Sequence, residues 1–137
     1  FREVSNLFKR GNCIEEGNTV EELKWTFTDP NNSNIYNAFI AINNNNTIIG
    51  VIGYVLSTYI KDEFEFRGVT PMSWKLKSDY KGIAGVSLFR KVSELEDIGI
   101  AIGGTEIARK LFPLFKYKYP KRAKSYIVAL IPQPAIV

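Results

Sequence analysis

The sequence contains no histidine and a single cysteine, Cys13. The absence of histidine removes the commonest protein metal ligand and the commonest proton-transfer group at neutral pH, which excludes a Ser-His-Asp triad and argues against structural zinc. One cysteine cannot form a disulfide within the chain. Nothing indicates that the nearby Lys9 and Arg10 activate its thiol, so we interpret Cys13 as structural. We therefore expect no metal site.

Long apolar runs are also lacking. No stretch approaches the roughly 18 uninterrupted apolar residues that a membrane-spanning helix needs. The first residues, which include Arg2, Glu3 and Lys9, do not resemble a signal peptide. We therefore expect a cytoplasmic protein with no membrane association.

The length of 137 residues, of which 45% are hydrophobic, predicts one domain spanning residues 1–137. Because the chain begins with Phe1 rather than Met, it is also compatible with a fragment of a longer polypeptide. The net charge of +4 arises from 18 basic and 14 acidic residues. This excess suits an anionic ligand but is smaller than nucleic-acid-binding domains usually carry.

The first half of the chain predicts a short helix, a second helix and a hairpin. The weak helical apolar spacing at the start places Phe1, Val4, Leu7 and Phe8 on one face. Thr19 and Glu22 form a capping box, which predicts a helix through Leu23 and Trp25 that ends before Asp29. Residues 31–34 are predicted to be a loop, and residues 36–42 and 47–60 two strands joined by an asparagine turn.

The second half predicts alternating strands and helices. We expect a charged connection at residues 62–67 and a strand at 68–77, with Met72, Trp74 and Leu76 on one face. An amphipathic helix follows, ending near Glu96, and then a short strand at 98–102. Thr105 caps a further helix, and a last strand is expected at 125–131. Strands and helices in this order predict an α/β domain with a mixed sheet.

A segment rich in small residues joins the predicted strand 68–77 to the next helix. It contains Gly82, Ala84 and Gly85, and Lys81 precedes them. The first amides of a helix lack partners within the helix, and the helix dipole favours negative charge there. A phosphate or pyrophosphate therefore suits this segment, with Lys81 as an additional cation. A tight strand-to-helix turn without a ligand explains the same residues equally well.

The order of motifs resembles that of the GNAT N-acetyltransferase superfamily over residues 36–131. The segment from Lys81 is similar to the family's acyl-CoA signature, R/Q-x-x-G-x-G/A, with Lys81, Ala84 and Val86 at its three defined positions. All three differ from the signature residues. Residues 105–112 are similar to the later N-x-x-A-x-x-L-Y helix of the family and lie at about the expected distance. Upstream, Trp25 and Pro30 resemble a subgroup linked to polysaccharide or cell-envelope modification.

The resemblance implies a mixed, mostly antiparallel central sheet with splayed parallel strands, flanked by helices. Acyl-CoA, with acetyl-CoA as the expected form, would enter where the strands of Leu76 and Ile100 separate. The residues expected to contact it are Lys75, Leu76, Lys77, Lys81, Gly82, Ile83, Ala84, Gly85, Val86, Ser87 and Thr105. The implied reaction is direct attack on the thioester by a small-molecule amine such as an amino sugar. A homodimer is compatible with this resemblance.

The acid and base for such a reaction are less clearly encoded. Many family members carry a proton-donating tyrosine where this chain has Phe112, and Pro113 is expected to kink the helix there. Glu65 is our first candidate for the base, followed by Glu63 and Asp62, although solvated surface charge explains all three.

Other functions stay open. Tyr54 and Tyr59 suit either an acceptor pocket or packing on a sheet face. The departures from the signature suggest, as an alternative, a catalytically inactive GNAT fold that binds CoA or a partner. Residues 116–122 interleave aromatic and basic side chains, as single-stranded nucleic-acid sites do, although a solvated loop or a contact with the 3′-phosphate of CoA explains them as well. Nucleic acid is the least favoured partner.

Overall fold

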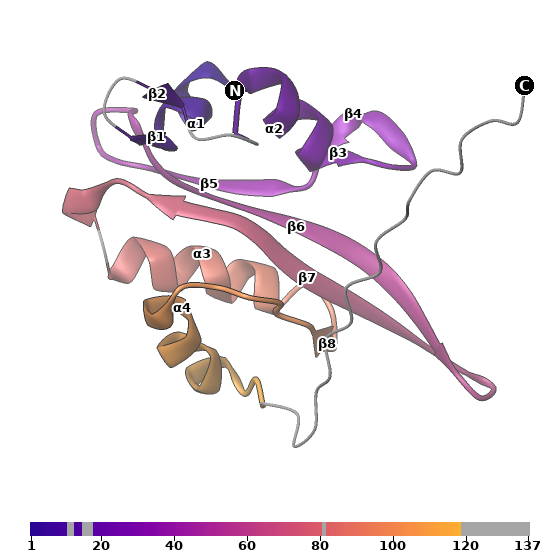
Figure 1. The fold of residues 1–137 in the computed structure, drawn as a ribbon. Helices are drawn as coiled ribbons and strands as arrows, with labels where there is room; N and C mark the ends of the chain where they lie inside the picture. Colours follow the sequence, from indigo (N-terminus) through magenta and orange to yellow (C-terminus); the bar gives the residue numbers. More distant parts are fainter. Residues whose placement is uncertain (11–12, 15–17, 81, 119–137) are drawn as a thin grey trace, which may run out of the picture.

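A computed structural model describes residues 1–10, 13–14, 18–80 and 82–118. A four-stranded sheet separates two layers of helices (Figure 1). Its strands, in spatial order, are β5 (Ala38–Ile42), β6 (Ile48–Lys61), β7 (Phe64–Leu76) and β8 (Ile98–Gly99). The first two pairs are antiparallel, and β7 pairs with β8 in parallel. The predicted mixed, mostly antiparallel sheet is therefore confirmed.

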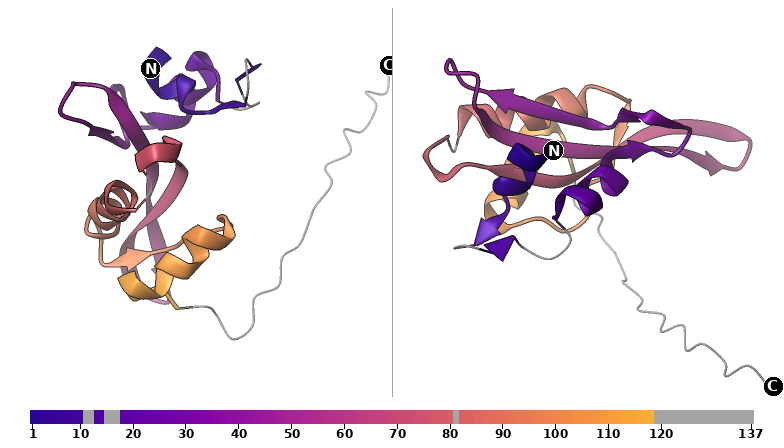
Figure 2. Two further views of the ribbon diagram at one scale, coloured as in Figure 1. Left: turned by 90° about the vertical axis from the view of Figure 1, so that its left-hand side faces the viewer. Right: turned by 90° about the horizontal axis from the view of Figure 1, so that it is seen from above.

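Each face of the sheet carries its own core. Helices α1 (Arg2–Asn6) and α2 (Val20–Phe27) cover one face, whereas α3 (Ile83–Ser93) and α4 (Glu106–Leu111) cover the other (Figure 2). Neighbouring residues of a strand point to opposite faces. Val51 accordingly packs with the residues of α1 and α2, and Ile52 packs with those of α3 and α4, both fully buried.

The N-terminal layer follows the sequence closely. The predicted capping box is present, because the Thr19 hydroxyl accepts from the Glu22 amide and the Glu22 carboxylate accepts from the Thr19 amide. The predicted buried face at the start of the chain is confirmed, because Val4, Leu7 and Phe8 are buried and Phe1 packs against them, although α1 itself ends at Asn6. Before α2, a short pair of strands forms from β1 (Lys9–Arg10) and β2 (Cys13–Ile14).

The predicted loop at residues 31–34 is wrong. Asn31 lies in a turn, but residues 32–34 belong to β4 (Asn32–Tyr36), which pairs with β3 (Thr28–Asp29) in a small antiparallel sheet. Asparagine is rare in strands, so the composition concealed the element. Asn37 then links this sheet to the main one, because its amide donates to the Phe27 carbonyl and its carbonyl accepts from the Tyr54 amide.

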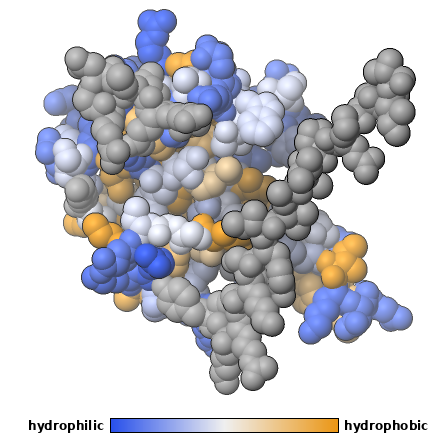
Figure 3. All heavy atoms as spheres, in the orientation of Figure 1, coloured by the Kyte–Doolittle hydropathy of each residue, from blue (hydrophilic) through white to orange (hydrophobic). Residues whose placement is uncertain are grey.

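The β6–β7 hairpin is longer than predicted. Residues 62–67, expected as a connection, contribute mainly to β7, and the turn is confined to Asp62 and Glu63. Asp62 adopts a φ of 56°, which a tight turn requires. The hairpin projects from the sheet, and exposed hydrophobic side chains, including Ile60 and Phe64, lie near its end beside hydrophilic ones (Figure 3). A 2.7 Å ion pair links Arg67 on the hairpin to Glu96.

A β-bulge interrupts β7 near its end. Gly53 pairs with Met72 but Val51 pairs with Lys75, so two steps along β6 match three along β7. The extra residue reverses the alternation of the two faces. Ser73, within the bulge, has a φ of 46°.

The bulge changes which side chains share a face. Val69 and Trp74 are five positions apart, yet both pack with the core beneath α3, as does Leu76. Met72 instead lies beside Gly53 on the face that α2 covers. The prediction that Met72 shares a face with Trp74 and Leu76 is therefore wrong, because the strand does not keep a period of two.

Other predictions concern the end of the chain. The strand expected at 98–102 is limited to β8, Ile98–Gly99, while the predicted helices α3 and α4 are confirmed. The strand expected at 125–131 lies outside the described residues. No helix in the described ranges is long and apolar enough to cross a membrane.

Candidate functional site

The two parallel strands separate soon after they meet. Val69 pairs with Gly99, and the Ile100 amide donates to the Val69 carbonyl at 2.9 Å. β8 ends at Gly99, whereas β7 continues to Leu76. Among the described residues, no strand lies beside the rest of β7 on this edge. The predicted separation of the two strands is therefore confirmed.

The hydrogen bonds of β7 show which of its backbone groups face the open edge. The Val69 carbonyl faces β8. The backbone of Pro71, two residues later, faces the same edge, and because proline has no N–H, no donor is left unpaired there. Beyond the bulge, the Lys77 amide donates away from this edge, to the Ile49 carbonyl at 2.8 Å. The backbone of Leu76, one residue earlier, therefore faces the open edge and can pair with a ligand.

A cavity of about 470 Å³ lies where the strands separate. Its walls come from β7, from the first turns of α3, from the loop after β8 and from α4. The lining residues are Pro71, Met72, Ser73, Trp74, Leu76, Gly82, Gly85, Val86, Phe89, Ala101, Ile102, Gly104, Thr105, Ile107, Ala108, Leu111 and Phe112. A cavity of this size, mainly apolar and bounded by a few polar groups, is typical of small-molecule and cofactor sites.

The N-terminus of α3 opens on this cavity through two glycines. Gly82 precedes the helix with a φ of 110°, a conformation that residues other than glycine rarely adopt. Gly85 is buried, and a Cβ there would stand 2.8 Å from Leu76 Cδ1 and 3.3 Å from Trp74 Cζ2. Gly82 thus shapes the entry to the helix, and Gly85 lets the helix approach β7.

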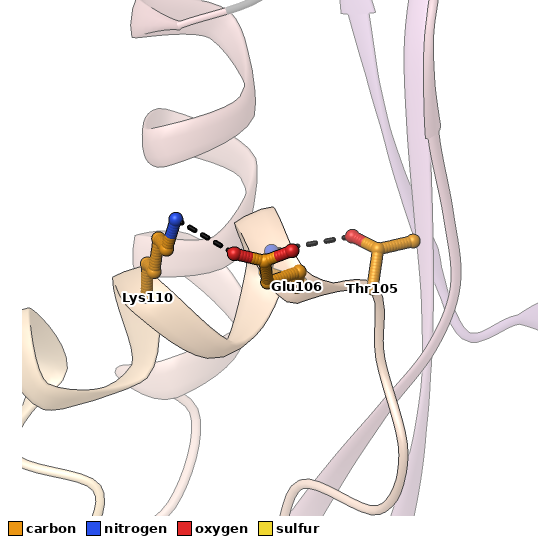
Figure 4. A network of polar contacts seen from close by, with 4 residues as sticks. Thr105, Glu106 and Lys110 are labelled. Atoms are coloured by element: carbon orange, nitrogen blue, oxygen red, sulfur yellow. Dashed lines mark hydrogen bonds and ion pairs between the residues drawn. The ribbon is translucent and has the colours of Figure 1, made fainter.

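Few polar side chains line the cavity. None of its described lining residues has an ionisable side chain. The Thr105 hydroxyl caps α4 by accepting from the Ala108 amide (Figure 4). The Trp74 indole Nε1 is buried and has no hydrogen-bond partner among the described residues. The Ser73 hydroxyl likewise makes no hydrogen bond to another described residue. Most directional contacts must therefore come from the backbone.

Helix α4 forms the outer wall. Besides its Thr105 cap, it carries an exposed Glu106–Lys110 ion pair of 2.8 Å (Figure 4). Ile107 lines the cavity, yet 68% of its surface is exposed. Ile102, in the preceding loop, also lines the cavity and is 81% exposed. This wall therefore presents an apolar surface at the mouth of the cavity.

Phe112 closes the cavity at the end of α4. It is 8% exposed, and its ring stacks on Phe89 with centroids 5.5 Å apart. The α-helix gives way to a 3-10 helix, η2 (Phe112–Phe115), at this point, as expected beside Pro113. A Cβ on Gly104 would stand 3.3 Å from Phe112 Cζ, so the tip of the ring faces the loop before α4.

The structure brings together only part of the predicted ligand-binding set. Five predicted residues line the cavity, namely Leu76, Gly82, Gly85, Val86 and Thr105. Five others, Lys75, Lys77, Ile83, Ala84 and Ser87, do not line it. The Lys75 ammonium lies 5.7 Å from the ring centroid of Phe8, on the opposite face of the sheet. Lys81 is outside the described residues.

The predicted acid and base candidates lie apart from the cavity. Glu65 is exposed on the projecting hairpin, six positions before Pro71, a span of about 20 Å along a strand. Glu63 and Asp62 lie still farther along, at the turn. The acidic residues at 62–65 could not be placed relative to the cavity from the sequence, because the segment predicted to be a connection is mostly extended strand.

The two candidate tyrosines contribute to packing. Tyr54 stacks on Phe39 with ring centroids 5.4 Å apart, and burial, with a smaller effect of the Asp29 charge, raises the pKa of its hydroxyl. Tyr59 lies against Gly68 on the hairpin. Neither lines the cavity. Sequence reasoning missed Ser73 and Trp74 as lining residues, and the alternation along β7 was the signal that could have found Trp74.

No protein-family model matches the sequence, and no curated protein matches it either. Solved structures do match. A mutant of the BH1408 protein from Bacillus halodurans shares 11% identity and a TM-score of 0.60, covering 94% of each chain. An acetyltransferase from Trypanosoma brucei shares 10% identity and a TM-score of 0.53, over 66% of this chain and 68% of that one.

A ribosomal-protein-alanine N-acetyltransferase from Brucella melitensis biovar Abortus 2308 shares 15% identity and a TM-score of 0.51, over 68% of this chain and 70% of that one. At such identities the likeness concerns the fold. Together with the separated parallel strands, it shows that the chain has the fold of the GNAT acetyltransferase superfamily.

Proposed function

We propose that this chain binds acyl-CoA in the cavity between β7 and β8 and transfers the acyl group to a small amine. The observation that carries the proposal is the open edge of β7, which leads along the cavity to the N-terminus of α3. An unpaired strand edge and an unpaired helix terminus suit a ligand with amides in its arm and phosphates at one end.

The phosphate end would lie at the start of α3. The amides of Ile83, Ala84 and Gly85 precede the first intrahelical bond, which the Val86 amide makes to the Gly82 carbonyl at 3.0 Å. These amides and the helix dipole favour an anion. Lys81, two residues before Ile83 in the sequence, would add a positive charge.

The arm of the coenzyme would run along β7. Its amide groups would pair with the backbone of Leu76 and its neighbours on the open edge, while the apolar wall of Ile107 and Leu111 covers its methylene groups. The acetyl group is the expected cargo. Acetyl-CoA would supply the activated thioester, and the protein would supply orientation and exclusion of water.

The reaction would proceed by direct transfer. The amine nitrogen forms a bond to the thioester carbonyl carbon, the carbon–sulfur bond breaks, and one amine proton ends on the sulfur of CoA. Because no described lining residue is ionisable, we assign both proton transfers to solvent and assign positioning and carbonyl polarisation to the protein. An amino sugar is one acceptor compatible with this chemistry.

A second function agrees with the lack of ionisable side chains among the described lining residues and with Phe112 at the position of the family's tyrosine. In this alternative, the chain binds CoA without transferring an acyl group. Calorimetry with acetyl-CoA, followed by measurement of free CoA thiol in the presence of a panel of primary amines, distinguishes the two. Amine-dependent release of thiol supports transfer; binding without release from any amine supports the alternative; absence of binding contradicts both.

A further inference from the structure

Ser73 occupies an unusual position in the cavity wall. It lies within the β-bulge of β7 and has a φ of 46°, in the left-handed region. Residues other than glycine and asparagine rarely adopt this conformation, and it disfavours the folded state. Strained backbone of this kind is concentrated at functional sites.

Its hydroxyl is also uncommitted. Two of the described residues that line the cavity carry a side-chain hydroxyl, Ser73 and Thr105. The Thr105 hydroxyl is engaged in capping α4, whereas that of Ser73 makes no hydrogen bond to another described residue. A half-buried hydroxyl in an apolar wall is stabilised when a ligand supplies the missing partner.

The position of Ser73 along the strand fixes which part of the ligand it would meet. This step rests on the proposed function, with the phosphates at Gly82 and the arm on the open edge of β7. From there the arm runs past Leu76 toward the point where β8 rejoins β7, at Val69. Ser73 lies between Leu76 and Val69, near the end of that path, where the thioester would be.

We propose that the Ser73 hydroxyl donates a hydrogen bond to the carbonyl oxygen of the bound thioester. This oxygen gains negative charge when the amine attacks, so the hydrogen bond strengthens as the reaction proceeds. Ser73 is thus a residue that contacts the reacting group.

Two substitutions separate the hydroxyl from the backbone strain. Ser73→Ala removes the hydroxyl and keeps the strain, whereas Ser73→Gly removes both. We expect Ser73→Gly to raise the urea midpoint of unfolding and Ser73→Ala to leave it near the wild-type value. Asn46→Gly is the matched control, because Asn46 has a φ of 58° in the β5–β6 turn and does not line the cavity.

Binding is measured with acetyl-CoA and with free CoA, which lacks the carbonyl group. Both Ser73 variants should lower the preference for acetyl-CoA over CoA by about 2- to 10-fold, the effect of one neutral hydrogen bond, and Asn46→Gly should not change it. With an amine that the wild type accepts, kcat should fall by about 100-fold in both variants, whereas KM for acetyl-CoA should rise by no more than the loss of affinity, about 2- to 10-fold.

Three results would overturn the proposal. The wild type and both variants could show the same preference for acetyl-CoA over CoA, in which case acyl-CoA binding stands without Ser73. A loss in only one of the two variants would assign the effect to the backbone. If neither ligand binds the wild type, the proposed function itself fails, and the role of Ser73 fails with it.

Discussion

Gly85 of α3 lies against Leu76 of β7 so closely that a Cβ at residue 85 would stand 2.8 Å from Leu76 Cδ1. This contact sets the distance between the helix whose N-terminus would hold the phosphates and the strand whose edge would hold the arm. The spacing between these two walls of the cavity therefore requires that residue 85 has no side chain.

Gly85→Val should lower stability and ligand binding together. The added methyl groups would collide with Leu76 and Trp74 and push α3 away from β7. Overpacking of this kind costs about 1–3 kcal/mol of unfolding free energy, measured by urea denaturation. Gly85→Ala should cost less, because the greater helix propensity of alanine, about 1 kcal/mol, offsets part of the clash.

Gly82→Ala tests a different physical cause at the same helix end. A Cβ there would meet no atom within 4 Å, but the φ of 110° is unfavourable for alanine. We expect a loss of about 1–3 kcal/mol from backbone strain alone. Equal stability of Gly82→Ala and the wild type would show that the backbone at this position differs from the one described.

Thr105→Ala should loosen the outer wall of the cavity. The substitution removes the hydrogen bond from the Ala108 amide to the Thr105 hydroxyl, which is 3.2 Å long and caps a helix of only six residues. Loss of an N-cap costs about 0.5–2 kcal/mol. Thr105→Ser retains the cap and serves as the control. Amide hydrogen exchange of α4 should accelerate in Thr105→Ala only.

Phe112→Tyr should not create the missing proton donor. The tip of the Phe112 ring faces Gly104 and the side chain is buried, so a hydroxyl there would be desolvated in a tightly packed site. We expect a loss of about 1–3 kcal/mol in unfolding free energy and no gain in kcat. A rise in kcat would instead show that residue 112 can reach the leaving sulfur.

Stability should fall in acid partly through Asp29. The Asn31 amide and the Asn37 side chain donate to its carboxylate at 2.8 and 3.1 Å, and these hydrogen bonds hold its pKa below the usual value. A lowered pKa in the folded state stabilises the protein above the unfolded pKa of about 3.9, and this contribution is lost as the pH falls through the folded value.

Asp29→Asn should therefore lower the urea midpoint slightly near neutrality, where the hydrogen-bonded carboxylate stabilises the folded state, and should reduce the pH dependence of the midpoint below about pH 4. The expected change is small because the carboxylate is solvent-accessible. An acid limb identical to that of the wild type would show that Asp29 does not contribute to it.

The sequence predicted those parts of the fold that local patterns determine. The Thr19–Glu22 capping box, the asparagine turn between β5 and β6 and the Thr105 cap were all recognised, because each depends on residues close in sequence. The extension of β7 to Phe64 was missed, since charged Glu65 and Arg67 concealed a regular alternation with Phe64 and Phe66.

The site was less predictable because it depends on register. The glycines at 82 and 85 could be recognised from their spacing, but the bulge that holds Ser73 arises from the pairing of β7 with β6, which no local pattern specifies. The separation of Glu65 from the cavity likewise follows from strand length. The bulge and the length of β7 both depend on tertiary pairing, and the sequence pattern predicted only part of this strand.

The central claim is that acyl-CoA binds between β7 and β8, and the thermal midpoint with and without acetyl-CoA tests it most directly. Ligand at 100 times its dissociation constant stabilises the folded state by about 2.7 kcal/mol, which corresponds to a rise of about 10 °C for a domain of this size. We predict such a rise for the wild type and a much smaller one for Gly85→Val. An unchanged midpoint at millimolar acetyl-CoA would contradict the claim.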